Sequence, residues 1–374
     1  MQRTPPARVG DHPSDVQTPA LLVDLDTLDD NIASMAHQAT AAGLALRPHA
    51  KTHKSVAIAR RQLLEGAAGL CCQKVSEAEA LLESGVEDML ISNHIVAAQP
   101  LRRMAALARR LRITTLIAES AQIDLLAAAA DYAGATIEVL VEIDAGDRRM
   151  GVADSEAILG LAEEVERRHG LHFRGLQAYN GPLQHLREQE ERSHAAREAA
   201  HRAATLRDRL ERRGIACPLI TGGGTGSFAT DLSTGAFTEI QPGSYVFMDL
   251  DYGRNRTGED EPYQPFRQSL FVLSTVINRA PRGAVYVDAG AKALNLDCGP
   301  PDVWGSAGLA YTKASDEQGR IEIAPGTLPP QLGEQLLLIP SHCDPTVNLF
   351  DWMVGIRGDR VEEVWPIEAR GCLS

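Results

Sequence analysis

The chain has 374 residues, of which 44% are hydrophobic and 23% charged, and its formal net charge is -13. This composition is typical of an ordinary soluble protein, and the length suits two domains better than one core. The acidic balance argues against a nucleic-acid or anionic-membrane partner, although a local cationic pocket for a phosphate is compatible with it. No run approaches the roughly 20 consecutive apolar residues that a membrane-spanning helix needs.

Residues 1–16 are rich in Pro, Asp and Arg and lack an apolar stretch, so we do not expect them to be a secretion signal. The six cysteines include the adjacent pair Cys71-Cys72, and they show neither the spacing of a disulfide framework nor that of a zinc finger. We therefore expect reduced thiols and a cytoplasmic protein.

From residue 18 to about residue 245, short apolar runs alternate with stretches of helical periodicity. We predict strands over residues 20–24, 44–48, 69–72, 88–92, 114–118, 137–143, 173–177, 219–221 and 239–240, and helices over residues 26–43, 55–65, 75–84, 100–110 and 187–213. Short apolar strands that are each followed by a helix are typical of a buried parallel sheet. Eight such units close into a (β/α)8 barrel of the TIM type, and an open doubly wound sheet is the competing architecture. The polar residues that follow strand after strand favour the barrel.

After Tyr252 the helical periodicity fades and strand-like runs dominate. The predicted strands of this part are residues 270–276, 284–288, 335–339 and 352–356. Gly and Pro separate these runs, as they do between the strands of β-rich domains. The chain is therefore an α/β barrel followed by a mostly-β domain that begins near residue 250.

Lys51 lies in the run Arg47–Lys54, just after an apolar strand, where the functional loops of a barrel gather. A lysine there can hold an aldehyde cofactor if burial or a neighbouring cation lowers the pKa of its amine. His49, His53 and Lys54 are its neighbours. Lys54 is a rival candidate, expected to face solvent or a phosphate, and a surface position at a helix start is the ordinary alternative for Lys51.

A glycine-rich loop, Gly222–Ser227, follows the predicted strand 219–221. Its glycines let the backbone approach an anion closely, and successive N–H groups can surround phosphate oxygens. The loop fits neither the dinucleotide pattern nor the Walker spacing, so it indicates a single phosphate. Gln241–Tyr245, after the next strand, can supply the other half of the cradle, and a plain tight turn is the alternative.

His342 and Asp344 are two residues apart, a spacing that puts both side chains on one face of a strand and Cys343 on the other. Imidazole and carboxylate ligands suit Mn, Mg, Fe or Zn, and two protein ligands leave open positions for water and substrate. The alternative is a packed histidine beside an aspartate that caps the following loop.

Arg149, Tyr179 and His185 lie in loops that follow two successive predicted strands. An arginine there can bind a carboxylate or face a pyridine ring, a tyrosine can stack or donate, and a histidine can transfer protons. Each alone is more often structural, but their recurrence after successive strands indicates a shared site.

Gln73 follows another strand and can contact a cofactor, and Asp249, Asp251 and Tyr252 lie where the two domains join. An acidic surface is the ordinary explanation for the two aspartates. Lysine, phosphate cradle and metal pair together indicate a pyridoxal-phosphate enzyme with a divalent ion beside the cofactor.

These residues together resemble the D-threonine aldolase and D-serine dehydratase-like family, pyridoxal-phosphate enzymes with the fold of alanine racemase. The resemblance runs nearly end to end, and its most specific stretches are residues 47–54, 71–78, 177–179, 222–227, 241–248 and 341–346. It implies a (β/α)8 barrel over residues 18–250 and a β domain over residues 251–374 that residues 1–17 join. It also implies a homodimer whose site is completed near the domain interface.

By this resemblance Lys51 matches the lysine that binds the cofactor as a Schiff base, and His185 matches a proton-transfer histidine. The positions that match cofactor contacts are Gln73, Arg149, Tyr179 and Tyr252, with Gly223, Gly224, Thr225, Gly243 and Ser244 in the phosphate cradle. His342 and Asp344 match the metal ligands. The dehydratase branch shows His-x-Cys with zinc and the aldolase branch His-x-Asp, so Asp344 favours the aldolase branch. A hard carboxylate favours Mn or Mg over Zn.

The resemblance implies retro-aldol cleavage of β-hydroxy-D-amino acids, such as D-threonine or D-allothreonine, to glycine and an aldehyde. The alternatives are an aldolase for 3-hydroxy-D-aspartate and a dehydratase for D-serine or 3-hydroxy-D-aspartate. A racemase would leave His342 and Asp344 without a role. A non-catalytic pyridoxal-phosphate carrier would resemble the barrel alone, so the β domain counts against it.

Overall fold

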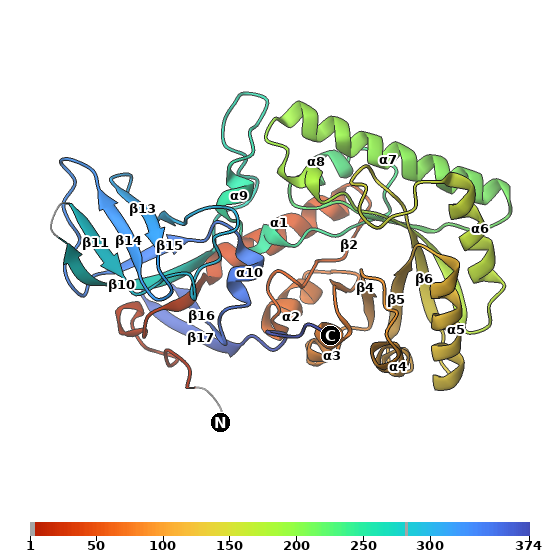
Figure 1. The fold of residues 1–374 in the computed structure, drawn as a ribbon, viewed down its shortest axis with the longest axis horizontal. Helices are drawn as coiled ribbons and strands as arrows, with labels where there is room; N and C mark the ends of the chain where they lie inside the picture. The colour runs from red at the N-terminus through yellow and green to blue at the C-terminus, as the bar shows by residue number, and fades with distance from the viewer. Residues whose placement is uncertain (1–3, 281–282) are drawn as a thin grey trace.

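A computed structural model describes residues 4–280 and 283–374 (Figure 1). The chain forms an eight-stranded parallel sheet with helices around it, and a separate nine-stranded sheet. Figure 1 shows the two units side by side, with the long helix α1 (Leu25–Ala41) running between them. Residues 1–3, which the resemblance assigns to the second domain, lie outside the described residues.

The parallel sheet curls into a barrel. Its strands are β2 (Ala45–Leu46), β3 (Leu70–Cys72), β4 (Asp88–Ile91), β5 (Arg112–Ile117), β6 (Ile137–Glu142), β7 (Leu171–Ala178), β8 (Leu219–Gly222) and β9 (Glu239–Ile240). They run in the order β2-β9-β8-β7-β6-β5-β4-β3, and a parallel bridge from His49 to Cys71 joins the two ends of this order. The predicted TIM-type barrel is therefore confirmed, and the open sheet is excluded.

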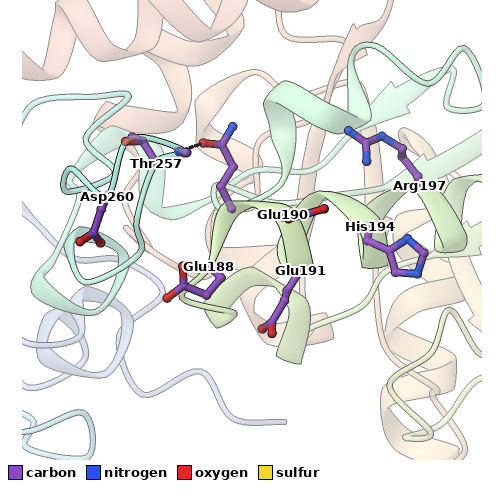
Figure 2. Close-up of a pocket in the computed structure, with 9 residues that line it drawn as sticks. Glu188, Glu190, Glu191, His194, Arg197, Thr257 and Asp260 are labelled. Carbon is purple, nitrogen blue, oxygen red and sulfur yellow. Dashed lines mark hydrogen bonds between the residues drawn. The ribbon is translucent and has the colours of Figure 1, made fainter.

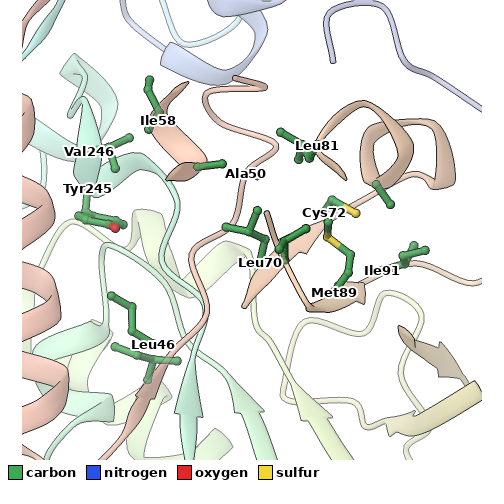
Figure 3. Packing of buried hydrophobic residues seen from close by; sticks show 14 of the residues in the cluster. Leu46, Ala50, Ile58, Leu70, Cys72, Leu81, Met89, Ile91, Tyr245 and Val246 are labelled. Carbon is green, nitrogen blue, oxygen red and sulfur yellow. The ribbon is translucent and has the colours of Figure 1, made fainter. Parts of the chain in front are cut away.

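Side chains of the barrel strands alternate between two hydrophobic layers. The inward set is a cluster formed by Cys71, Leu90, Leu116, Leu140 and Leu219. Their neighbours along the same strands belong to the larger core that packs against the helices, and Figure 3 shows part of that core with Cys72, Met89 and Ile91. Strands that are apolar on both faces explain why the sequence shows continuous apolar runs rather than alternation.

Helices follow most of the barrel strands, as predicted. The helices of the described residues are α1, α2 (Val56–Leu64), α3 (Val75–Ala80), α4 (Ala98–Leu107), α5 (Ser120–Ala133), α6 (Ser155–Glu166), α7 (Gln189–Arg212), α8 (Phe228–Asp231), α9 (Leu250–Gly253) and α10 (Cys343–Val347), with short 3-10 turns at Pro13–Asp15, Leu82–Ser84, Pro182–His185 and Ser244–Val246. Of these, α1 follows β1 and α10 lies in the second unit. Asp24 starts α1 by accepting a bond from the Thr27 N–H, and the left-handed Gly134 ends α5. The predicted helix over residues 75–84 divides into α3 and a 3-10 turn.

The second sheet is mostly antiparallel. Its strands are β1 (Ala20–Asp24), β10 (Leu270–Ala280), β11 (Ala284–Val287), β12 (Asp302–Val303), β13 (Leu309–Ala314), β14 (Gly319–Ile323), β15 (Gln335–Ile339), β16 (Trp352–Arg357) and β17 (Arg360–Pro366). The four strands predicted after residue 252 correspond to β10, β11, β15 and β16. The expected mostly-β second unit is therefore confirmed.

The prediction that residues 20–24 form a strand of the barrel is wrong. This strand, β1, pairs antiparallel with β10 and parallel with β16, inside the second sheet. Both partners lie more than 240 positions away in the chain, so a local pattern of apolar residues before a helix cannot distinguish the two sheets. In the described chain, β1 thus belongs to the second unit and α1 leads from it to the barrel. After β9 the chain re-enters the second unit.

Candidate active site

Five of the predicted site residues line one cavity at the carboxyl ends of the barrel strands. The cavity has a volume of about 210 Å³. These five residues are Lys51, Gln73, Arg149, Tyr179 and His185. They follow β2, β3, β6 and β7, so the curvature of the barrel brings together side chains that are up to 134 positions apart in the chain. This is the end of a TIM barrel at which active sites are built.

Lys51 extends toward the second unit. Its Nζ lies 3.4 Å from Asp344 Oδ2, and its side chain is 39% exposed while that of Asp344 is 15% exposed. The Asp344 carboxylate raises the pKa of the Lys51 amine, which outweighs the opposing effect of burial. The expectation that neighbouring cations lower this pKa is therefore wrong, because the nearest charge is a carboxylate.

The other polar residues of the 47–54 segment are buried. Lys54 is buried and forms an ion pair with Glu77, so the expectation that it faces solvent or phosphate is wrong. Burial lowers the pKa of His49 well below its usual value and that of His53 to about 4, so both rings are neutral. The Gln73 side-chain amide donates to His49 Nε2 (3.1 Å) beside Lys51.

The predicted phosphate cradle lies at the ends of the neighbouring strands β8 and β9. A Cβ at Gly223 would lie 2.5 Å from Asp231 Oδ2, and one at Gly224 would lie 2.6 Å from Gln184 Oε1. Gly223 also has a left-handed φ of 69°, so two independent constraints require glycine there. These contacts keep the buried loop close-packed.

Two further observations support an anion at this loop. The Thr225 Oγ1 hydroxyl is buried without a hydrogen-bond partner, a state that costs free energy unless a ligand supplies the partner. On the other side, a Cβ at Gly243 would lie 2.6 Å from Thr52 Oγ1, so the Gly243-Ser244 turn packs directly against the Lys51 loop. Glycine backbone, free hydroxyl and adjacent lysine fit the phosphate and aldehyde of pyridoxal phosphate.

Arg149 and Tyr179 form one wall of the cavity. The Arg149 guanidinium lies 5.8 Å from the centre of the Tyr179 ring and 3.7 Å from Glu142 Oε1. Glu142 is buried and also lies 2.8 Å from His94 Nε2. Sequence reasoning missed Glu142 and His94, although Glu142 is the final residue of β6, where a polar side chain after an apolar run was a signal.

The His342–Asp344 segment is not a strand, contrary to the prediction. His342 is the N-cap of the short helix α10, and Asp344 lies in its first turn. Pro345 suits this position because its fixed φ favours the first helical turn. Burial would raise the pKa of Asp344, but Lys51 and His342 together lower it to about 2, so the carboxylate is ionised.

Two residues that the sequence analysis missed stand beside His342. Asp297 Oδ2 lies 3.1 Å and Cys298 Sγ 3.9 Å from His342 Nδ1. Within the described residues, Asp297, Cys298 and His342 form a group whose ligand atoms lie within 4.8 Å of one another. Imidazole, carboxylate and thiol donors of this kind suit a divalent cation. Their only sequence signal is the Asp-Cys pair, which lies more than 40 positions from His342.

His185 and Tyr252 meet at the junction of the two units. Their ring centres are 5.1 Å apart, and His185 Nδ1 lies 2.6 Å from Asp251 Oδ2. Asp251 is only 6% exposed, so the interpretation of Asp249 and Asp251 as an acidic surface is wrong. Asp249 is buried too, and its Oδ2 accepts a bond from the Cys343 N–H (2.9 Å), which fixes α10 over the barrel.

A larger and more open hollow lies elsewhere, at the start of α7 (Figure 2). Its volume is about 620 Å³, and Glu188, Glu190, Glu191 and His194 line it together with Thr257 and Asp260. Four of its lining residues are acidic, and it shares no residue with the cavity around Lys51. It contains no lysine that could hold an aldehyde cofactor.

No helix in the described part of the chain is both long enough and apolar enough to cross a membrane.

Comparisons with known proteins agree with this geometry. Residues 23–251 match the model of the alanine racemase N-terminal domain, and residues 269–356 match that of a putative serine dehydratase domain. A D-threonine aldolase of an Arthrobacter species is 46% identical over 98% of this chain and 96% of its own length. A 3-hydroxy-D-aspartate aldolase of Paracoccus denitrificans is 40% identical over 98% of this chain and 95% of its own length.

Among solved structures, D-threonine aldolase from Filomicrobium marinum superposes with a TM-score of 0.96 at 43% identity, and the match covers all of both chains. The D-threo-3-hydroxyaspartate dehydratase of Delftia sp. HT23 has a TM-score of 0.85 at 28% identity, over 95% of this chain and 98% of the other. The chain therefore belongs to the D-threonine aldolase and D-serine dehydratase-like family of fold-type III pyridoxal-phosphate enzymes, and it is a lyase.

Proposed function

We propose that the protein cleaves β-hydroxy-D-amino acids, such as D-threonine and D-allothreonine, to glycine and an aldehyde, with pyridoxal phosphate and a divalent metal ion. The single observation that carries this proposal is the 3.4 Å contact between Lys51 and Asp344. It joins the cofactor lysine that follows β2 to the segment that carries His342, nearly three hundred positions away in the chain. The similarity to two aldolases over almost the whole chain supports it.

In this proposal Lys51 holds the aldehyde of the cofactor, and the backbone of Gly223, Gly224 and Gly243 surrounds its phosphate with the hydroxyls of Thr225 and Ser244. Gln73, Arg149, Tyr179 and Tyr252 position the ring and the substrate. When bound, pyridoxal phosphate takes up the electrons that the broken Cα–Cβ bond releases. The buried, neutral His49 adds no charge near the lysine.

Two groups of the chain would act on the β-hydroxyl of the substrate. His342 and Asp344 would hold a divalent ion, and such an ion lowers the pKa of a hydroxyl that it binds. The ionised carboxylate of Asp344 is a hard ligand, which favours Mn²⁺ or Mg²⁺ over Zn²⁺. His185 would accept the hydroxyl proton, and release of that proton starts the cleavage of the Cα–Cβ bond.

The oligomeric state and the cellular location are also proposals. We propose a homodimer, in line with the family, and a cytoplasmic enzyme. Analytical ultracentrifugation checks the first point, because a homodimer has twice the chain mass of 40.3 kDa.

Two other activities are the main competitors. An aldolase for 3-hydroxy-D-aspartate would use the same residues, and a relative of that activity is 40% identical. A dehydratase would instead remove the α proton and expel the hydroxyl group, and such a relative is 29% identical. His-x-Asp at residues 342–344 favours aldol cleavage over dehydration.

Product analysis tests the proposal. The holoenzyme is incubated with D-threonine, D-allothreonine, 3-hydroxy-D-aspartate and D-serine in turn. We expect glycine and acetaldehyde in equal amounts from both threonine isomers and no 2-oxobutanoate. Formation of 2-oxobutanoate and ammonia without glycine would show a dehydratase. Cleavage of 3-hydroxy-D-aspartate but of neither threonine isomer would show that the enzyme requires a substrate with an acidic side chain.

A further inference from the structure

An ion pair and several hydrogen bonds hold Asp251 in place. Its carboxylate forms an ion pair with Arg187, and its backbone carbonyl accepts a second bond from the same guanidinium (2.6 Å). Its backbone N–H donates to Ser341 O (3.1 Å), next to His342. Asn255, which is fully buried, accepts from Arg187 (2.8 Å) and donates to Gln184 O (2.9 Å). The barrel therefore holds Asp251 through its side chain, and the second unit holds it through its backbone.

The fixed carboxylate determines which nitrogen of His185 carries a proton. Burial would raise the pKa of Asp251, but the bonds from His185 and Arg187 lower it well below the usual range. An ionised carboxylate only accepts hydrogen bonds. The 2.6 Å contact to Asp251 Oδ2 therefore requires a proton on Nδ1 of His185, which leaves Nε2 as the unprotonated nitrogen of the neutral ring.

The two sides of the ring differ in their surroundings. His185 lines the cavity together with Lys51, Arg149 and Tyr179, whereas Asp251 does not line it. Tyr252 packs against the ring at 5.1 Å and restricts its rotation. Nδ1 therefore bonds to Asp251 at the junction between the two units. The unprotonated Nε2 is the nitrogen that remains for the cavity.

We infer that Asp251 is the positioning residue of His185: it holds the imidazole in the tautomer whose Nε2 accepts the β-hydroxyl proton of the substrate. The inference rests on the proposed function, because His185 accepts that proton only in the cleavage reaction. The proton moves from the substrate oxygen to Nε2, the O–H bond breaks and an N–H bond forms. The Asp251 carboxylate stays ionised and stabilises the resulting imidazolium without taking the proton.

Asp251→Asn is the most informative variant. It keeps the shape of the side chain but replaces the oxygen that accepts from His185 with an NH2 group that donates. Arg187 only donates, so the new amide oxygen faces Arg187 and the amide NH2 faces His185. An amide donor forces Nδ1 to accept, which moves the proton of the neutral ring to Nε2 and removes the base. Asp251→Glu restores a carboxylate and serves as the conservative variant. Asp260→Asn changes an exposed carboxylate of the same segment and serves as the control.

The tautomer is read directly by long-range ¹H–¹⁵N NMR of the ¹⁵N-histidine-labelled holoenzyme, in which His185→Gln identifies the His185 signals. We expect a protonated Nδ1 and an unprotonated Nε2 in the wild type, and the reverse in Asp251→Asn. A protonated Nε2 in the neutral wild-type ring overturns the inference. This readout does not depend on turnover, so it remains informative if D-threonine proves not to be the substrate.

Kinetics supply the second readout. We expect Asp251→Asn to lower kcat for D-threonine by about 10²- to 10⁴-fold, the usual contribution of a general base, with KM within about threefold of the wild type. Asp251→Glu should recover part of kcat, and Asp260→Asn should leave both constants unchanged. The double variant His185→Gln/Asp251→Asn should lose no more than His185→Gln alone, because a positioning residue acts only through its partner. If the loss of kcat in the double variant equals the product of the losses in the two single variants, the inference is contradicted.

Discussion

The contact between Lys51 and Asp344 gives each charged group a partner before any cofactor or metal ion binds. Lys51 must lose a proton to react with an aldehyde, because an ammonium ion is not a nucleophile, and the contact with Asp344 favours the protonated form. In the proposed function, a divalent ion on Asp344 would weaken the same contact and remove the main cause of the raised pKa of Lys51. Metal binding and cofactor attachment would then be coupled through one pair of residues.

Attachment of the cofactor at Lys51 is open to a chemical test. Borohydride reduction of the holoenzyme, followed by proteolysis and mass spectrometry, should place the pyridoxyl group on Lys51. Lys54 is the natural internal comparison, since it lies three positions away but is buried in an ion pair with Glu77. An adduct on Lys54, or on any lysine outside the cavity, would contradict the assignment.

At the scale of elements, the cradle depends on a close approach between the Gly222–Ser227 loop and the 3-10 turn before α7. Gly226 N–H donates to Gln184 Oε1 (2.9 Å), and the Gln184 amide donates to Ser227 Oγ (2.8 Å). Ser227 in turn donates to Asp231 at the end of α8 (2.6 Å). The loop is thus held from both sides before a phosphate binds, which reduces the entropy lost on binding.

Gly224→Ala should weaken cofactor binding. The added Cβ would lie 2.6 Å from Gln184 Oε1, so the loop must shift and misalign its N–H groups. Loss of one or two charge-assisted bonds predicts a dissociation constant about 10- to 100-fold higher for pyridoxal phosphate, measured by absorbance titration of the apoenzyme. Gly160→Ala is the matched control, because a Cβ there meets nothing within 4 Å on α6. Equal affinities of Gly224→Ala and the wild type would show that this loop does not hold the cofactor.

Asp231 makes the stability of the apoenzyme depend on pH. Burial raises the pKa of Asp231 to about 7 from its ordinary value of 3.8, so the folded protein keeps a proton that the unfolded chain loses. Between about pH 4 and pH 7 this residue therefore lowers the free energy of unfolding as pH rises, by at most about 1.4 kcal/mol per pH unit. Asp231→Asn should remove this contribution in urea unfolding at pH 5 and pH 8. Parallel pH dependence of variant and wild type would contradict the account.

At the scale of the molecule, the barrel could be predicted because its signals are local. Each strand is apolar on both faces and is followed by a helix, so the pattern in the sequence is the same wherever the strand pairs. For the same reason, residues 20–24 were predicted in the barrel, although β1 pairs with β10 and β16 in the second sheet. Strands β13 and β14 were missed because polar and apolar side chains mix in this hairpin and neither strand is a continuous apolar run.

The site was predictable where chemistry follows a strand directly, as at Lys51, Arg149 and Tyr179. It was not predictable where segments far apart in the chain meet. Asp297 and Cys298 lie more than 40 positions from His342, and Asp251 lies 66 positions from His185. The local spacing at His342–Asp344 suggested a strand, whereas the helix α10 begins there at Cys343, with His342 as its N-cap.

The proposed function requires the cofactor and the metal ion to share one site, although Lys51 and Asp344 lie nearly three hundred positions apart in the chain. The ³¹P NMR signal of bound pyridoxal phosphate tests this claim most directly, because the unpaired electrons of Mn²⁺ broaden nearby nuclei. One equivalent of Mn²⁺ should broaden the ³¹P signal strongly in the wild type, Mg²⁺ should leave it sharp, and His342→Ala/Asp344→Ala should abolish the effect of Mn²⁺. A ³¹P signal that stays sharp while Mn²⁺ is bound to the wild type would contradict the shared site.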